Sequence, residues 1–369
     1  MKQQWIDSWR GLLISAIVLF HVAGVASFYS PESVKPFFTG LVDVLQSFHT
    51  PAFFCLAAVT WKTRDGSAWK WIFGKVKRLL VPYWVFGILS MVLYLAMGTM
   101  MVKSASGTGA EGAYAAYGFS EWWHPIAALA HGGEWPNGVG LKCNQVLWFL
   151  PCMFATVVTY YFLDRRVRNK WLALALVFPL TVVFVGILNT GFYVLPFGIQ
   201  RVPRLLGLMI FARCAISIVP VVDPTSRKTR LLWLVGALAA FALVYVFFDV
   251  PPCFGKYTGW KYWTIFPVML CLHSVRTFLL IACTAIMAQA ITCGWLARIG
   301  VASIGIMLMH KFVILAFQVK SSVAVAIFGN AWFACIGVVA VTALAIFLTM
   351  FATTCIRKYA PWAIGVSGA

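Results

Sequence analysis

Two polar side chains interrupt the first long apolar stretch of the chain, Arg10 near its start and His21 inside it. They are eleven residues apart, so in an α-helix both lie on one face, about 16 Å apart along the axis. Desolvating an ionisable side chain in a membrane span is costly, so such a residue marks a candidate functional site. The alternative is a neutral histidine hydrogen-bonded to a neighbouring helix, and this stretch alone does not separate the two.

A second histidine, His49, lies in the next apolar stretch. If that stretch enters the membrane from the opposite side, His49 lies at a depth similar to that of His21. Pro51 follows closely and breaks the local helical hydrogen bonding, which would let His49 approach the first stretch. A kink without any function is the structural alternative for Pro51.

Basic residues also occur in later apolar stretches. Arg201 and Arg204 are three residues apart, and His310 lies in a stretch near the end of the chain. Such groups need anionic or polar partners in the membrane, and a bound ligand could supply them. For His310, a hydrogen bond to a neighbouring helix is the alternative.

A cationic pair precedes the third apolar stretch. Lys75 and Arg78 are three residues apart and share one helix face at the expected membrane surface. Together with Arg10 they would form a site with three cations, which suits phosphate groups. The alternative is ordinary positive charge on the inner side of a membrane protein.

The composition indicates which elements position these residues. Of 369 residues, 62% are hydrophobic and only 11% are charged, about half the charged fraction of a typical soluble domain. We expect an all-α polytopic membrane protein, a single domain over residues 1–369, with a retained first span rather than a cleaved signal peptide. The ten expected spans are 9–28, 38–61, 79–101, 146–163, 171–190, 198–219, 230–249, 263–291, 297–318 and 332–356.

Charge in the loops predicts the orientation. With both termini inside, the inner loops carry most of the basic loop residues, namely Lys62, Arg64, Lys70, Lys75, Lys77, Arg78, Arg165, Arg166, Arg168, Lys170, Arg213, Arg227, Lys228, Arg230, Arg298, Arg357 and Lys358. The outer loops carry Lys35, Lys103, Lys142, Lys256, Lys261 and Lys320. We therefore expect both termini to be cytoplasmic, and we interpret the net charge of +19 as membrane topology and not as nucleic-acid binding.

The longest expected loop, 102–145, would then lie outside the membrane. It contains Glu134 and the tryptophans Trp122, Trp123 and Trp135, whose rings could stack on sugars. An aromatic belt at the membrane interface is the alternative. A loop of this length exceeds what a connection needs, which indicates a role in function.

The ten cysteines give no evidence of a metal site, because no CxxC pair and no Cys/His ligand spacing occurs. Most of them lie in apolar stretches, where cysteine behaves as a small buried hydrophobe. Cys143 and Cys253 fall in expected outer loops, and the sequence leaves open whether they pair.

Five segments, in order, resemble the acyltransferase-3 family of membrane O-acyltransferases. They are Arg10-x10-His21, Phe48-His49-Thr50-Pro51-Ala52-Phe53-Phe54, Lys75-x-x-Arg78-Leu79-x-x-Pro82-Tyr83, Leu147-Trp148-Phe149-Leu150 and Ser303-x-x-Ile306-x-x-x-His310. The set is most similar to the branch that includes fucose 4-O-acetylase and related sugar acetyltransferases.

The resemblance implies transfer of an acyl group, usually acetyl, from cytoplasmic acyl-CoA to a hydroxyl of an extracytoplasmic or lipid-linked glycan. It implies that Arg10, Lys75 and Arg78 bind the CoA phosphates, and that His21 acts as general base or acyl carrier. His49 would orient the acceptor or stabilise an oxyanion. Asp7 is the third catalytic candidate, with an ion pair to Arg10 as its alternative role.

The remaining candidates and partners follow from the same resemblance. The acceptor-side candidates are Trp148, His310, Arg201, Arg204 and Glu134. Membrane lipids, acyl-CoA and a glycan or glycolipid acceptor are the expected partners, with no metal and no nucleic acid, and a homo-oligomer is left open. The family implies a bacterial inner membrane as the location.

The sequence departs from the family pattern at Lys75, where arginine is common, and at Thr50 and Ala52, where bulkier residues are common. A lysine would contact phosphate through one point and not through two. A rival interpretation is a transporter or flippase of an anionic or glycan-linked lipid, in which the buried cations bind a head group without acyl transfer.

Overall fold

The computed structural model describes residues 2–62, 66–104, 124–133, 141–189, 195–215, 226–248, 260–291, 293–319 and 321–366. Over these residues the chain is helical and no strand occurs, which confirms the expected all-α class. Glu134, Cys143 and Cys253 carry predictions that fall outside the described side chains, as do Trp122, Trp123 and Trp135.

Seven helical segments in the described part are long and apolar enough to cross a membrane, namely Gln4–Tyr29, Lys35–Val59, Ala68–Leu93, Asn144–Arg166, Arg227–Phe247, Thr264–Ile291 and Ala331–Tyr359. A bent pair raises the number to eight if it counts as one span. The ten expected spans are therefore not confirmed. In the fifth, the part with described side chains is the shorter apolar helix Lys170–Phe184. The sixth contains α10 (Val202–Ala215), which has 14 described residues.

The expected span 297–318 is not a straight helix. It consists of α13 (Gly294–Val301) and α14 (Ser303–Val319), and the two axes meet at 79°. The apolar composition of this stretch predicted one continuous span, but the structure breaks it at Ala302. Arg357, on α16 (Ala331–Tyr359), donates a hydrogen bond to the Val301 carbonyl at the end of α13, where unpaired helix carbonyls need a donor.

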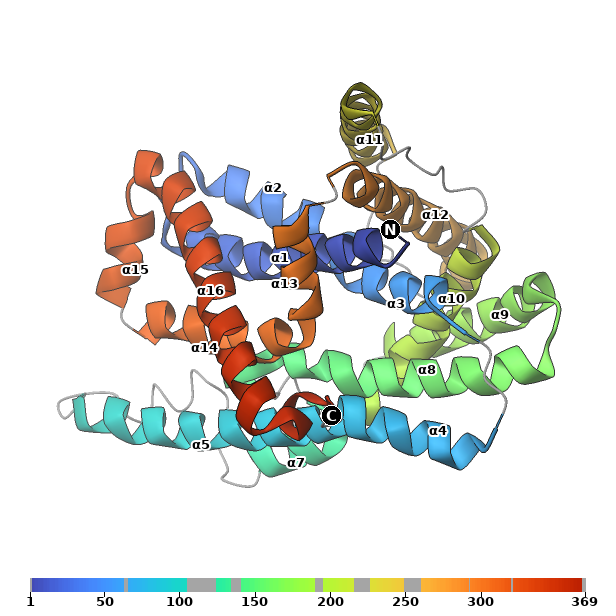
Figure 1. Ribbon diagram of the computed structural model, residues 1–369, viewed down its shortest axis with the longest axis horizontal. Coiled ribbons are helices and arrows are strands. Elements are labelled where there is room, and N and C mark those ends of the chain that lie inside the picture. The colour runs from blue at the N-terminus through green and yellow to red at the C-terminus, as the bar shows by residue number, and fades with distance from the viewer. Residues whose placement is uncertain are drawn as a thin grey trace.

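The first helix, α1 (Lys2–Tyr29), lies in the interior of the bundle (Figure 1). It packs against α2 (Lys35–Gln46), α3 (His49–Val59), α12 (Trp260–Ile291), α13, α14, α15 (Ser321–Phe328) and α16. Trp9 Nε1 donates a hydrogen bond of 3.0 Å to Thr284 Oγ1 of α12. The helix that carries Arg10 and His21 therefore packs against helices from both ends of the sequence.

Two glycines let α1 and α13 approach closely. A Cβ on Gly300 would overlap the carbonyl of Asp7, and a Cβ on Gly11 would overlap the carbonyl of Leu296. Such backbone-to-backbone contact between small residues is a common means of association for membrane helices. It places the start of α1, with Asp7 and Arg10, firmly against α13.

A second layer contains α8 (Phe149–Arg166), which follows η3 (Lys142–Trp148), together with α4 (Ala68–Lys75), η1 (Val76–Leu80) and α5 (Val81–Ser104). In Figure 1, α4 and α5 run below α8, and α7 (His124–His131) lies under α5. Tyr83 is fully buried and donates a hydrogen bond of 2.5 Å to the Leu129 carbonyl of α7. The remaining helices are α9 (Lys170–Asn189), η4 (Pro196–Arg201), α10 and α11 (Arg227–Phe247).

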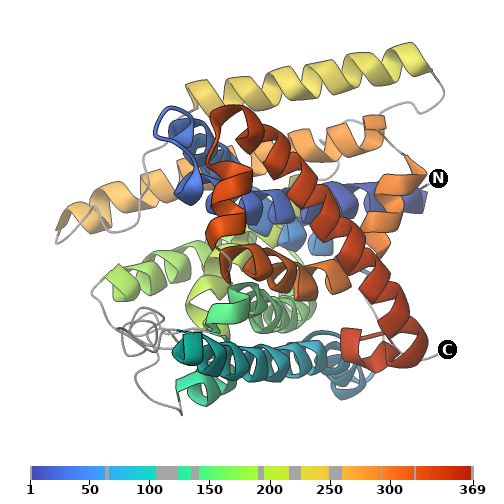
Figure 2. The same cartoon turned by 90° about the vertical axis from the view of Figure 1, so that its left-hand side faces the viewer.

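Both ends of the chain lie at the same edge of the bundle. In Figure 2, α1 begins and α16 ends at the right-hand edge. The turn η5 (Pro361–Ile364) follows α16 there and packs against α5 and η1. The cytoplasmic location of this edge stays a prediction from loop charge.

Candidate active site

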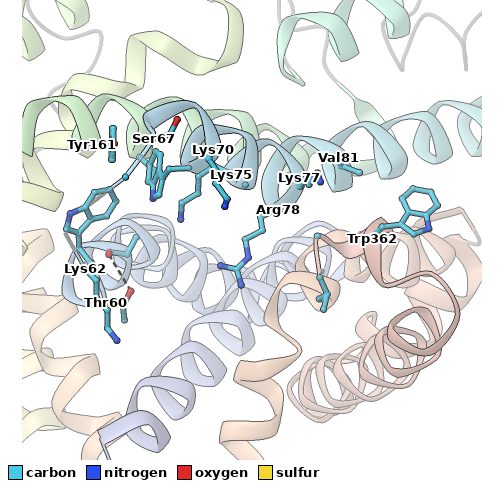
Figure 3. Close-up of a pocket in the computed structure, with 18 of the residues that line it drawn as sticks. Thr60, Lys62, Ser67, Lys70, Lys75, Lys77, Arg78, Val81, Tyr161 and Trp362 are labelled. Carbon is cyan, nitrogen blue, oxygen red and sulfur yellow. Dashed lines mark hydrogen bonds between the residues drawn. The ribbon is translucent and has the colours of Figure 1, made fainter. Parts of the chain in front are cut away.

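A cavity of about 1450 Å³ opens at the edge where α1 begins (Figure 3). Its walls come from the start of α1, the end of α3, α4, η1, the start of α5, α8 and the turn after α16. Six of its lining residues are cations, namely Arg10, Lys62, Lys70, Lys75, Lys77 and Arg78, and none of the described lining residues is acidic. The cavity is therefore built to hold an anion.

The three residues predicted to bind phosphate meet in this cavity. Arg10 comes from α1, Lys75 ends α4 and Arg78 lies in η1, and all three line the same cavity. In Figure 3 the Arg78 guanidinium reaches into the middle of the cavity, and Lys70 and Lys75 point to the same side. Lysine and arginine groups placed in this way suit the oxygens of a phosphate or diphosphate.

Asp7 forms an ion pair with Arg10. Its Oδ1 accepts a hydrogen bond of 2.9 Å from Arg10 Nη1, and the two residues are one helical turn apart. The Asp7 side chain is 16% exposed, while that of Arg10 is 37% exposed. This geometry matches the ion-pair alternative for Asp7. Among the described residues, Asp7 has no contact with His21, His49 or His310.

Aromatic rings form part of the cavity wall. Trp71 and Tyr161 stack with ring centroids 4.3 Å apart and planes at 17°, and Lys75 Nζ lies 5.3 Å from the Trp71 ring centre. Trp61 is held by a hydrogen bond of 3.2 Å from Nε1 to Asp164 Oδ2. Flat apolar surfaces beside cations suit a ligand that carries both a heteroaromatic ring and phosphates.

Three histidines from three helices gather deeper in the bundle. His21 of α1 and His310 of α14 have ring centroids 5.2 Å apart. Phe20 lies between this pair and His49 of α3, with its centroid 4.8 Å from each of His21 and His49. The structure therefore brings together three residues that are separated by up to 289 positions in the chain.

Hydrogen bonds orient two of these rings. His49 Nδ1 lies 2.6 Å from the Leu45 carbonyl oxygen, and His310 Nδ1 lies 2.9 Å from the Ile306 carbonyl oxygen. A carbonyl oxygen can only accept, so each Nδ1 carries the proton. In the neutral rings, each Nε2 then presents a lone pair and can act as a base or accept a hydrogen bond.

His310 is fully buried, and its Nε2 has no hydrogen-bond partner. His21 is only partly buried, and it lies within electrostatic range of His49, His310 and Lys311. A buried unpaired nitrogen is costly, and in a native fold it calls for an explanation such as a catalytic role. A hydroxyl group of a bound acceptor could supply the missing donor.

Trp148 and Arg201 form a pair outside the cationic cavity. The Arg201 guanidinium carbon lies 4.3 Å from the Trp148 ring centre, a typical cation–π distance. Arg204 is partly buried on α10, one turn after Arg201. Neither arginine lines the cavity, so the predicted acceptor-side residues do not join the predicted phosphate site.

Sequence reasoning missed Asn144, which lies in η3. Asn144 is fully buried, its Nδ2 donates a hydrogen bond of 2.8 Å to the Leu308 carbonyl of α14, and its Oδ1 has no partner. It thus ties the segment before Trp148 to the helix that carries His310. The signal was present as an amide side chain directly before an apolar run, but one asparagine is weak evidence.

The structure is that of a helical membrane protein with a cationic cavity at one edge and a cluster of histidines inside. The chain belongs to the acyltransferase-3 family, because residues 3–350 match the family model described as "Acyltransferase domain". It is thus an integral, multi-pass membrane acyltransferase. Searches of curated proteins and of solved structures found no match.

Proposed function

We propose that the protein transfers an acetyl or other short acyl group from cytoplasmic acyl-CoA to a hydroxyl of an extracytoplasmic or lipid-linked glycan. The observation that carries this proposal is the cavity at the start of α1, the helix that also carries His21; its described lining has six cations and no acidic residue. Arg10 and His21 lie about 16 Å apart along that helix. A donor held by its phosphates in the cavity would have to extend its acyl end inward along α1.

Arg10, Lys75 and Arg78 are proposed to bind the CoA phosphates, with support from Lys62 and Lys70. Arginine can contact a phosphate through two nitrogens, whereas lysine offers a point charge. The stacked rings of Trp71 and Tyr161 would offer the adenine a flat apolar wall. The flat wall beside the cations supports a nucleotide thioester, and not a simple anion, as the proposed ligand.

His21 is proposed as the reacting histidine. As general base it would take the proton of the acceptor hydroxyl while the hydroxyl oxygen attacks the thioester carbonyl. The carbon–sulfur bond then breaks, and the thiolate of CoA takes up a proton. As acyl carrier it would instead attack the carbonyl itself and pass the acyl group on in a second step.

His49 and His310 are proposed to orient the acceptor or to stabilise the charge on the carbonyl oxygen, which requires a protonated ring nitrogen facing that oxygen. The acceptor would approach from the side opposite the cavity, where loop 102–145 with Glu134, and the Trp148–Arg201 pair, would select it. A sugar acceptor, as in the fucose 4-O-acetylase branch, and a bacterial inner membrane are part of this proposal.

The test is binding of acetyl-CoA to the purified protein by calorimetry, with wild type, Arg10→Ala, Arg78→Ala and the control Arg166→Ala. Arg166 is an exposed cation at the end of α8 that does not line the cavity. We expect saturable binding by wild type and the control, and about tenfold to a hundredfold weaker binding by each cavity variant.

Absence of binding by folded wild type would overturn the proposed donor and favour the transporter alternative. Equal affinity in all four proteins would show that acetyl-CoA binds elsewhere. Transfer of a radiolabelled acetyl group to membrane glycans, measured in parallel, separates donor binding from the reaction itself.

A further inference from the structure

The turn after α16 is built into the wall of the cavity. Trp362, Gly365 and Val366 line the cavity, while Ala363 and Ile364 are buried against α5 and η1. Gly365 N donates to the Trp362 carbonyl at 3.1 Å, and Val366 N donates to the Pro361 carbonyl at 3.0 Å. These bonds close the turn and fix its backbone.

Gly365 lies directly against the backbone of Arg78. A Cβ at position 365 would lie 2.8 Å from Arg78 Cα and 2.9 Å from its carbonyl carbon, and closer still to the carbonyl oxygen. Gly365 also has a φ of +70°, in the left-handed region that favours glycine. Two independent constraints, the contact and the backbone angle, therefore require a residue without a side chain.

The backbone at Arg78 does not follow a regular α-helix. Arg78 lies in η1, a π-helical turn in which Val81 N donates to the Val76 carbonyl. In an α-helix the Arg78 carbonyl would accept from the amide of residue 82, but Pro82 has no amide hydrogen. The irregular turn widens the helix where Arg78 enters the cavity, and single π-turns of this kind are frequent at functional sites.

We propose that Gly365 is a positioning residue that holds the Arg78 guanidinium in place for the donor phosphates. The turn lies against the Arg78 backbone from outside the helix, within the π-helical turn that precedes Pro82. The side chain of Arg78 can then reach the middle of the cavity from a fixed base (Figure 3). This inference rests on the proposed acyl-CoA site.

The first test compares two substitutions at Gly365 with two control glycines that do not line the cavity. Gly365→Ala adds both a strained φ and a clash, while Gly365→Asn tolerates the left-handed φ better but keeps the clash. Gly40 on α2 and Gly236 on α11 do not have a positive φ, and a Cβ at either would meet nothing within 4 Å.

We expect both Gly365 variants to bind acetyl-CoA about fivefold to tenfold more weakly, with KM raised to match and kcat within about twofold of wild type. Gly40→Ala and Gly236→Ala should bind within about twofold of wild type. If Gly365→Asn binds like wild type while Gly365→Ala does not, strain and not contact with Arg78 explains the effect, and the proposal is wrong.

The second test is a double-mutant cycle with Arg78→Ala. If Gly365 acts through Arg78, Gly365→Ala should weaken binding no further once the guanidinium is gone. Equal losses in both backgrounds would overturn the positioning role, although acyl-CoA binding itself would stand. Absence of binding by wild type would overturn the donor site and this inference together.

A third variant keeps the test decisive if the Gly365 variants do not fold. Ile364 is 2% exposed, so Ile364→Ala loosens the turn through lost packing without placing atoms against Arg78. We expect the same pattern. Ile364→Ala should weaken acetyl-CoA binding in the wild-type background and should cause no further loss in the Arg78→Ala background. Unchanged binding by folded Ile364→Ala would contradict the proposal.

Discussion

Asp7→Asn separates an electrostatic role for Asp7 from a catalytic one. The asparagine amide oxygen can still accept the hydrogen bond of Arg10, so the geometry of the 2.9 Å contact is kept while the negative charge is lost. A catalytic carboxylate would not tolerate this change. A residue that only holds Arg10 would tolerate it well.

The expected size follows from Coulomb's law. A phosphate bound to Arg10 would lie about 6 Å from the Asp7 carboxylate, and at that distance in water two like charges repel by about 0.7 kcal/mol. Removing the carboxylate should therefore lower the KM for acetyl-CoA by up to about threefold. Because Arg10 is 37% exposed, salt screens this effect, and it should vanish in about 0.5 M NaCl.

The assay is steady-state acetyl transfer at low and high salt, with the purified protein in detergent or nanodiscs. Asp7→Ala is the comparison, since it removes the hydrogen bond as well and should raise KM. A fall in kcat of a hundredfold or more for Asp7→Asn, with KM unchanged, would refute this reasoning and assign proton transfer to Asp7.

Three further predictions concern the interior and the outer side. His21→Gln should lower transfer by at least about a hundredfold while acetyl-CoA binding stays within about threefold, and equal transfer rates would remove His21 from the reaction. Gly300→Ala should lower the melting temperature and the yield of folded protein, because its Cβ would overlap the Asp7 carbonyl. Gly236→Ala on α11, where a Cβ meets nothing within 4 Å, should be neutral in the same melting assay. Exchange of loop 102–145 with that of another family member should change acceptor preference, and an unchanged preference would exclude the loop from selection.

Much of the cationic cavity could be predicted because it depends on local spacing. Arg10 lies near the start of the first apolar run, and Lys75 and Arg78 directly precede the third. Positive-inside topology alone therefore places all three at one membrane edge. The histidines were similarly expected at comparable depth in their spans. Depth is a property of position along a helix, and the sequence shows that position directly.

The parts that could not be predicted depend on tertiary contact. The stretch around Ala302 has no proline, and Gly300, Ser303 and Gly305 permit a bend of 79° without requiring one. The bend depends on partners far away in the chain, such as Arg357 at the Val301 carbonyl. The contribution of Gly365 to the cavity was missed for the same reason, because it lies 287 positions beyond Arg78.

The ten expected spans are not confirmed in the described part of the chain, because hydropathy does not report helix length. The stretch 198–219 is apolar enough for a span, but η4 precedes α10 and takes up the residues Pro196–Arg201. Phe197 and Gly198 have positive φ angles there, so the helix begins only at Val202. A buried short helix and a membrane span share the same composition.

The position of α1 has a consequence for how the protein is made. This helix leaves the ribosome well before α13, α14, α15 and α16, and its contacts with them involve residues from Gly294 onward. At bacterial or eukaryotic synthesis rates of about 5 to 20 residues per second, that separation corresponds to a wait of about 15 to 60 s. During this interval Arg10 and His21 are in the membrane without their final neighbours. Insertion machinery or early partners such as α2 and α3 must then shield the polar face of α1 until the last helices arrive, so variants that weaken the α1–α13 contact should expose the nascent protein to quality-control proteases before they affect the finished enzyme.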